Sequence, residues 1–204
     1  MGCLRIGTLY DYRRAEHQRG ITDPSEGKKQ VTHHVSSLHI ANSNDPLMRR
    51  SKDFRSLEAF RAMRIENSTD IRIENCTFAQ DFDVPDCFIY CLSSTSSRKM
   101  YGEFEGSNSC TEIVDTASFL QLVTESLNAI SAVNFQGLHR VTYAPRDEEW
   151  NGADWGTHPA LLKNPTFSKQ AELRAIWTPK FEIEIKPVVI GNSQIPSACR
   201  LLNL

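Results

Sequence analysis

The sequence lacks the features that mark membrane and exported proteins. None of its apolar runs approaches the ~20 residues that a transmembrane helix needs. The first residues contain no apolar signal-peptide core, and Ile6 stands where a myristoylation signal requires Ser or Thr. We therefore expect a cytoplasmic protein that does not associate with a membrane.

Several catalytic and metal-binding motifs are also missing. There is no Gly-rich phosphate loop, no Gly-x-Ser-x-Gly elbow and no His-Glu-x-x-His motif. The six cysteines are irregularly spread and form no Cys-x-x-Cys pair, which favours buried free thiols over a disulfide or zinc framework. His33 and His34 are neighbours on an expected strand and face opposite ways, so we predict no metal site there.

What is present is typical of an ordinary globular domain. The 204 residues are 40% hydrophobic and 24% charged, with a net charge of −2. This length and composition predict one domain spanning residues 1–204 with a sizeable core. Strand patterns outnumber helix patterns and do not alternate with them, which predicts an α+β fold with a mixed, mostly antiparallel sheet and a few packed helices.

Apolar periodicity places the main elements. Cys87-Phe88-Ile89-Tyr90-Cys91-Leu92 is apolar on both faces and predicts a buried central strand. Apolar residues recur with helical spacing after Asp115, which predicts an amphipathic helix with Asp115 as its N-cap. Residues 144–166 predict a long irregular loop that contains Trp150 and Trp155. Other strands are expected at 4–9, 31–40, 71–74, 138–143 and 181–186, and a short helix around 54–63.

The late stretch 167–177 holds the most suggestive polar pattern. Gln170, Glu172 and Arg174 alternate with apolar residues, so a strand here would send all three to one face. They could line a cleft, or they could form the solvated side of an edge strand. Arg174 is expected to be the structural partner of Glu172.

Two earlier segments carry groups suited to a nucleotide. The region from Arg5 to Lys29 is rich in Arg and Lys, which could bind a pyrophosphate or could simply form a solvated surface. The expected central strand runs into hydroxyl-rich residues at 93–97, which could orient a sugar or could form an ordinary loop.

Three features, taken in chain order, resemble the Arg/Ser-Thr-Ser/Glu pattern of toxin-type mono-ADP-ribosyltransferases. They are Arg5, the Ser94-Thr95-Ser96 motif and Gln170-x-Glu172. The resemblance implies an ADP-ribosyltransferase-like fold and NAD as substrate, with Glu172 and Gln170 as catalytic residues. In that family the Glu stabilises the ribosyl cation as nicotinamide leaves, and the residue two positions earlier positions the acceptor. The separation of Ser96 and Gln170 is longer than is typical of the family, so the resemblance requires the helix and long loop between them to be an insertion. Residues expected to bind NAD are Arg5, Thr8, Tyr12, Arg13, Ser94, Thr95 and Ser96, with Trp155 as an alternative to Tyr12 for stacking on nicotinamide.

A second resemblance covers more of the chain. Asp23-Pro24-Ser25-Glu26-Gly27, Tyr90-Cys91-Leu92-Ser93 and Lys163 followed by Glu172-Leu173-Arg174 look like an uncharacterised bacterial domain family. Its members typically carry Asn-Asp-Pro-Phe-Glu, a Cys-Phe-Ser strand and a late Lys…Glu-x-Glu-x-Arg. The family often occurs among accessory or defence-associated bacterial genes.

Together these patterns lead to one main hypothesis and two alternatives. The main hypothesis is a mono-ADP-ribosyltransferase or NAD glycohydrolase, acting as a bacterial toxin or phage-defence effector on a protein or nucleic-acid acceptor. The first alternative is a non-catalytic nucleotide- or nucleic-acid-binding module that uses the same cationic face. The second is a protein-interaction domain with Trp150 and Trp155 as anchors.

Overall fold

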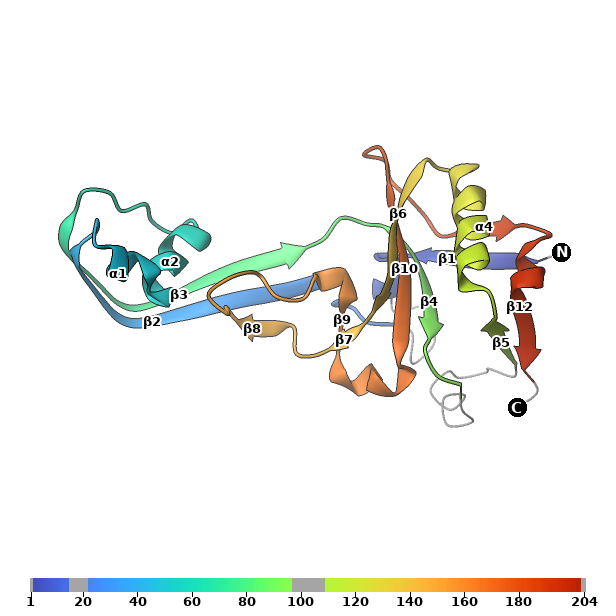
Figure 1. Cartoon of the computed structure of the whole chain (residues 1–204), viewed down its shortest axis with the longest axis horizontal. Helices are drawn as coiled ribbons and strands as arrows, with labels where there is room; N and C mark the ends of the chain where they lie inside the picture. The colour runs from blue at the N-terminus through green and yellow to red at the C-terminus, as the bar shows by residue number, and fades with distance from the viewer. Residues whose placement is uncertain (1, 15–21, 97–108, 203–204) are drawn as a thin grey trace. The chain divides into compact units, whose positions relative to one another are not determined.

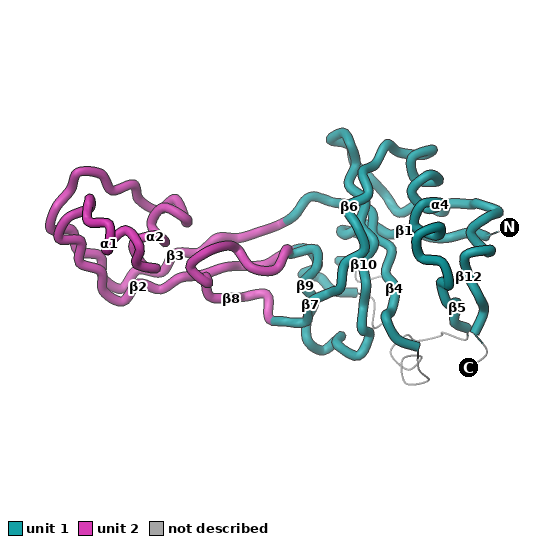
Figure 2. Tube along the Cα trace, in the orientation of Figure 1, with its two compact units in different colours: residues 1–27, 84–144, 159–204 teal, residues 28–83, 145–158 magenta. Residues whose placement is uncertain are grey.

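The computed structural model describes residues 2–14, 22–96 and 109–202. These residues form an α+β fold with mostly antiparallel sheets, as the sequence predicts. The chain divides into two compact units (Figure 2). Unit 1 comprises residues 1–27, 84–144 and 159–204, and unit 2 comprises residues 28–83 and 145–158. No helix in the described part of the chain is long and apolar enough to cross a membrane.

Unit 1 is built on a five-stranded sheet in the order β11-β1-β4-β10-β6 (Figure 1). Every neighbouring pair in this sheet is antiparallel. Its strands are β1 (Cys3–Thr8), β4 (Phe88–Ser93), β6 (Val133–Arg140), β10 (Glu172–Pro179) and β11 (Val188–Gly191). The central position of β4 confirms the buried strand predicted at 87–92.

Smaller elements complete unit 1. A second, two-stranded sheet pairs β5 (Cys110–Ile113) with β12 (Cys199–Leu202), and a short parallel pair joins β7 (Thr142–Tyr143) to β9 (Leu162–Lys163). The 3₁₀ helices are η1 (Asp11–Arg13), η2 (Pro159–Leu161), η3 (Pro165–Gln170) and η4 (Ile195–Ala198).

Helix α4 (Thr116–Asn128) covers one face of the five-stranded sheet. Asp115 caps it as predicted, because its carboxylate accepts a hydrogen bond from Ser118 N at 3.0 Å. Phe119, wholly buried, packs against Tyr90 of β4 with ring centroids 5.6 Å apart. The indole of Trp177 on β10 donates to Thr124 Oγ1 at 2.8 Å, so the helix is tied to the sheet by both apolar packing and a hydrogen bond.

The opposite face of the sheet has a smaller apolar cluster. Leu9, Ile89 and Ile176 are buried there together with Cys87, and Cys91 packs against them. Strand alternation places Arg174 on this face and Ala175 and Trp177 on the helix-covered face. The thiols of Cys87 and Cys91 therefore share the face of Ile89. Burial raises the pKa of Cys87 to about 12.

Unit 2 is a long antiparallel ribbon of β2 (Lys28–Asn42) and β3 (Thr69–Asp83), with β8 (Asp147–Glu149) paired in parallel to the start of β2. Helices α1 (Pro46–Arg50) and α2 (Lys52–Ala59) lie in the connection between β2 and β3 (Figure 1). Both ribbon strands are longer than the sequence predicts, because their inward-facing positions change phase between Val35 and Leu38 and between Ile73 and Cys76. A single period-two pattern therefore does not run through either strand. Their apolar residues pack on α2 in a core of Val35, Leu38, Ile40, Leu57, Ile65 and Ile73.

Trp150 and Trp155 belong to an aromatic cluster within unit 2. Trp150 is buried and lies edge-on to Phe60, and Trp155 packs on both Phe60 and Phe82. The Nε2 atom of the buried His33 lies 2.8 Å from Asp53 Oδ1, and its ring is edge-on to Trp150. Trp150 is thus an internal residue of unit 2, whereas Trp155 is half-buried against the two phenylalanines. Residues 144–166, expected to be irregular, in fact contain β8, η2 and β9.

Two sequence predictions of strands are wrong. Residues 181–186 alternate between apolar and charged types but form no strand, since Phe181 and Ile183 are exposed and both edges of β10 are already taken by β4 and β6. The stretch 167–177 is not one strand, because 165–170 is the 3₁₀ helix η3 and β10 begins at Glu172.

Phe119→Ala should lower the free energy of unfolding by ~3–5 kcal/mol, since it opens a cavity between α4 and the sheet. Chemical unfolding followed by circular dichroism measures this. Phe181→Ala is the matched control, because Phe181 is 69% exposed and should change stability by less than ~0.5 kcal/mol. Equal losses in both variants would contradict the assigned core.

Candidate functional site

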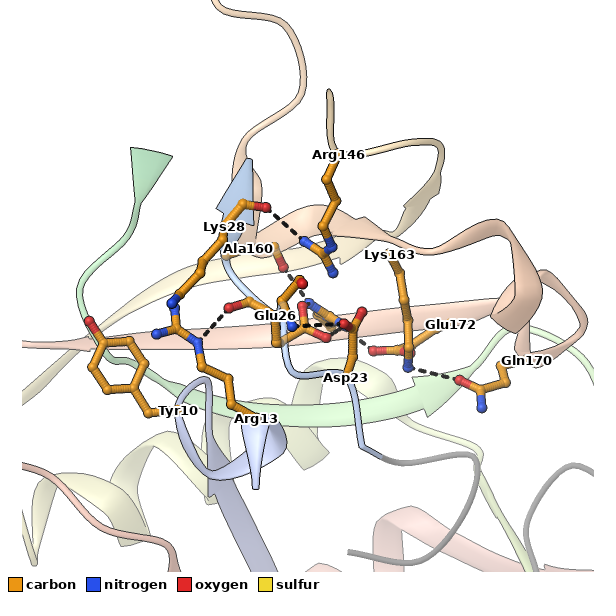
Figure 3. Close-up of polar contacts among 12 residues, drawn as sticks. Tyr10, Arg13, Asp23, Glu26, Lys28, Arg146, Ala160, Lys163, Gln170 and Glu172 are labelled. Carbon is orange, nitrogen blue, oxygen red and sulfur yellow. Dashed lines mark hydrogen bonds and ion pairs between the residues drawn. The ribbon is translucent and has the colours of Figure 1, made fainter. Parts of the chain in front are cut away.

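The candidate site is a group of buried charged side chains on the face of the sheet opposite α4 (Figure 3). At its centre Arg174 of β10 is only 2% exposed. Its Nε donates to Glu172 Oε1 at 2.6 Å, and two further nitrogens donate to the carboxylate of Glu26 at 2.7 and 3.1 Å. Nη1 also donates to the carbonyl of Ala160 at 2.6 Å. The guanidinium is therefore held in a fixed orientation by two carboxylates and a backbone oxygen.

A second cation meets Glu172 from the other side. Lys163 Nζ lies 2.5 Å from Glu172 Oε2 and 2.8 Å from Gln170 Oε1. Its ammonium also lies over the ring of Phe167, 4.9 Å from the centroid. The oxygens of Glu172 thus each contact a different cation, and Gln170 shares the second one (Figure 3).

Electrostatics favour the charged forms of Glu172 and Arg174. Burial by itself raises the pKa of Glu172, but Arg174 and Lys163 lower it more, so the net pKa is below its usual value. Burial likewise lowers the pKa of Arg174, and the carboxylates of Glu172 and Glu26 outweigh that effect and raise it. The two carboxylates and two cations have no net charge between them, which is the condition under which charges persist in a protein interior.

Glu26 reaches the site from a tight turn in the Asp-Pro-Ser-Glu-Gly sequence. Asp23 Oδ1 accepts from Ser25 N at 3.0 Å, and the carbonyl of Asp23 accepts from Glu26 N at 2.9 Å. Gly27 then adopts φ +71°, and a Cβ there would lie 2.5 Å from Leu9 Cδ2. Asp, Pro and Gly each suit such a turn, so the local sequence explains why the carboxylate is delivered here.

The backbone reverses just before β10. η3 ends at Gln170, and Ala171 adopts the left-handed conformation with φ 44° and ψ 47°. This reversal, rather than strand alternation, brings Gln170 to the same cation as Glu172. Ser93 Oγ donates to the carbonyl of Gln170 at 2.9 Å, and Ser94 Oγ donates to that of Ala171 at 3.0 Å. The hydroxyls that follow β4 therefore stabilise the turn that positions Glu172.

Tyr12 occupies the sheet face beside this network. Its hydroxyl packs over Gly7, where an added Cβ would lie 2.7 Å from the Tyr12 oxygen. Burial raises the pKa of Tyr12, and its hydrogen-bonded neighbour Cys91 raises it further. Arg5 and Glu172 both lie close enough to influence that pKa. Tyr12 thus lies near both of these predicted site residues.

Arg5 lies on β1 and its side chain is about half exposed, at 47%. It is paired with the buried carboxylate of Asp11, with Nη2 and Oδ2 2.5 Å apart. Strand register places Arg5 on the same sheet face as Glu172, because Gly7 pairs with Ile89 and Ile89 with Ile176. The structure therefore brings Arg5 and Glu172 to one face, with the guanidinium accessible to an external anion.

The remaining predicted site residues serve mainly the local fold in this structure. Thr8 is buried, and its hydroxyl accepts from Asp11 N at 3.1 Å. Arg13 donates from Nε to the Glu26 carbonyl at 2.6 Å and stacks 4.1 Å from the centroid of Tyr10. Thr95 and Ser96 are exposed at the end of β4, and Thr95 N donates to Ser93 Oγ at 3.2 Å. Trp155 lies in unit 2 and Tyr12 in unit 1.

The polar pattern of residues 167–177 gave no indication of four other residues of the network. They are Glu26, Cys91, Tyr143 and Lys163. Tyr143 accepts a hydrogen bond from Glu172 N at 2.8 Å, and Glu172 is also a hydrogen-bond neighbour of Cys91. The signal for three of them was present, since Glu26, Cys91 and Lys163 stand in the motifs of the second resemblance. Nothing in the sequence around Tyr143 indicates its contact.

Comparisons with protein-family models, with characterised proteins and with solved structures found no match to this chain. The function must therefore be inferred from the geometry of the site. No group of His, Cys, Asp and Glu within residues 2–14, 22–96 and 109–202 is arranged to hold a metal ion.

Glu172→Gln should lower the free energy of unfolding by ~3–5 kcal/mol at pH 7, because it leaves two buried cations with one carboxylate. Since the folded pKa of Glu172 is lowered, its stabilising contribution is complete above the unfolded value of about 4.3. That contribution is lost as the pH falls through the folded pKa. The difference between wild type and variant should therefore shrink in acid.

Urea unfolding between pH 3 and pH 8 measures this difference, with Glu182→Gln as the control because Glu182 is exposed. A constant difference across that range would show that the charge of Glu172 is not what stabilises the site.

Proposed function

We propose that this chain is an NAD-cleaving enzyme of the ADP-ribosyltransferase-like type, in which the carboxylate of Glu172 stabilises the ribosyl cation. The observation that carries the proposal is an ionised, rigidly held carboxylate on the same sheet face as an accessible arginine. Cleavage of the C–N glycosidic bond develops positive charge on the ribose, and a fixed carboxylate lowers the energy of that transition state.

The contacts of the other residues support a division of roles. Arg5 is oriented by Asp11 and suits the pyrophosphate of a dinucleotide. Ser94 donates to the backbone immediately before Glu172, so it would support the scaffold that holds the catalytic carboxylate. Gln170 shares a cation with Glu172, so the two acceptors of the Gln-x-Glu motif already act together.

Lys163 occupies the position that the substrate would have to take. Its ammonium rests between Gln170 and Glu172, where the proposal places the developing ribosyl cation. Binding of NAD therefore has to displace Lys163 from Glu172 Oε2, while Arg174 continues to hold Oε1. On release of nicotinamide the ribosyl group passes to water or to a macromolecular acceptor. A toxin or phage-defence effector would use either reaction.

A non-catalytic nucleotide-binding module is the second candidate. It is favoured by the fact that both oxygens of Glu172 are engaged and that this residue is only 4% exposed. A module of this kind would bind NAD through Arg5 and leave it intact, with an affinity that falls steeply as salt is added.

Nicotinamide release from NAD distinguishes the two candidates. The enzyme should release nicotinamide, and Glu172→Gln should slow the release by ~100-fold or more. Arg5→Ala should weaken NAD binding about tenfold, because it removes a charged hydrogen-bond donor. Arg72→Ala, an exposed arginine of β3, is the matched control and should change neither quantity.

Circular dichroism of each variant must show the wild-type spectrum, so that loss of fold is not mistaken for loss of catalysis. Release that continues at the wild-type rate in a folded Glu172→Gln variant would rule out the proposed role. NAD binding without any release would favour the module.

A further inference from the structure

A pocket of about 540 Å³ lies in the helical connection of unit 2, remote in sequence from the charged network of unit 1. Its apolar lining includes Phe54, Leu57 and Ile65, of which the last two belong to the core of unit 2. Three arginines, Arg49, Arg61 and Arg64, line the same space. Its volume lies within the range of ~300–1,000 Å³ that small-molecule sites occupy.

The charge of this region differs from that of the whole chain. Residues 46–66 contain six basic side chains against three acidic ones, whereas the complete chain carries a net charge of −2. Two of the acidic residues, Glu58 and Glu66, also line the pocket. The lining therefore combines an excess of guanidinium groups with two carboxylates and an apolar surface.

The three arginines are held differently. Arg49 donates from Nε to the carbonyl of the buried Ser43 at 2.8 Å, which fixes its orientation. Arg64 pairs with Glu66, at 2.6 Å from Nη2 to Oε1, on an exposed surface. Arg61 forms no ion pair or side-chain hydrogen bond among the described residues. An external anion is thus the natural partner for Arg61.

The backbone conformation of Arg61 is unusual for a residue with a long side chain. Helix α2 ends at Ala59, and Arg61 takes the left-handed conformation with φ 52°. Its amide donates to the carbonyl of Glu58, and that of Ala62 to the carbonyl of Leu57, each at 2.9 Å. Glycine or asparagine usually occupies this position after a helix, because side chains with a Cβ are strained there. A long cationic side chain kept at a strained position beside a pocket points to a binding role.

We propose that this pocket binds a small organic anion with a flat apolar body, of the mononucleotide class. The guanidinium groups of Arg49 and Arg61 would hold the phosphoryl group, for which their planar donors are suited. The base would lie against Phe54, Leu57 and Ile65. Glu58 and Glu66 supply acceptors for hydroxyl or amino groups of the same ligand. Inorganic phosphate alone would leave this apolar surface exposed to water.

Adenosine monophosphate is the probe, and the methyl resonance of Met63 in the full-length protein is the reporter, because Met63 lines the pocket. The resonance should shift saturably with adenosine monophosphate, and should not shift at the same concentrations of adenosine or of inorganic phosphate. The Met63 resonance is assigned as the methyl signal that is absent from the spectrum of Met63→Leu. Because the reporter lies in unit 2, nucleotide binding in unit 1 does not produce the signal, and failure of either proposal can be told from failure of the other.

Arg61→Gly separates binding from folding. It should weaken binding about tenfold while leaving the thermal midpoint unchanged or higher, because glycine relieves the left-handed strain. Arg72→Ala is the control and should bind like wild type. The proposal is overturned if Met63 does not respond, if phosphate alone produces the same shift, or if Arg61→Gly binds as tightly as wild type.

Discussion

The guanidinium of Arg174 requires two carboxylates around it, and much of unit 1 is arranged to supply them. A buried cation without partners would be strongly destabilising, whereas one with matched carboxylates and a backbone acceptor is tolerated. Glu172 comes from the start of β10, the strand that carries Arg174. Glu26 comes from a turn 148 residues before Arg174 in the chain. Ala160 contributes its carbonyl from η2. The turn that carries Glu26, the helix η2 and the strand β10 therefore meet around this guanidinium.

The same contacts give Glu172 the properties that the proposed chemistry needs. Arg174 and Lys163 keep the carboxylate ionised in a site where burial alone would favour its protonated form. The hydrogen bonds from Ser93 and Ser94 to the preceding backbone fix its position. A carboxylate whose orientation is set before substrate arrives can stabilise a developing cation without reorganising. Stability and proposed catalysis thus depend on one set of interactions, and Lys163 is the member that substrate would replace.

The sequence was most informative where local pattern determines structure. Helical periodicity with its Asp115 cap, and the doubly apolar strand through Ile89, are both confirmed. The pairing of Arg174 with Glu172 could be predicted because alternation on one strand brings them together. Sequence patterns gave wrong predictions where tertiary contacts, rather than local sequence, determine the backbone conformation. The sequence pattern predicts a strand at Ala171, where the structure has a left-handed turn, because the alternation of polar and apolar residues is the same in either conformation.

Contacts between residues that are far apart in the chain could not be predicted from a single sequence. Nothing local indicates that Glu26 faces Arg174, or that Tyr143 accepts a hydrogen bond from the backbone of Glu172. The family resemblances placed Glu26, Cys91 and Lys163 in motifs, but motifs alone assign no contacts. The arginines around the pocket of unit 2 are likewise dispersed over residues 49–64, and only the fold of α2 and the turn after it gathers them.

The most direct test of the account is the structure of the Glu172→Gln protein with NAD bound. Removal of the carboxylate should allow intact NAD to remain in the site. The pyrophosphate should lie at Arg5 and the nicotinamide ribose beside residue 172, and Lys163 should be withdrawn from its place next to Gln170. An unoccupied sheet face, with Lys163 still bound to Gln170 at saturating NAD, would contradict it.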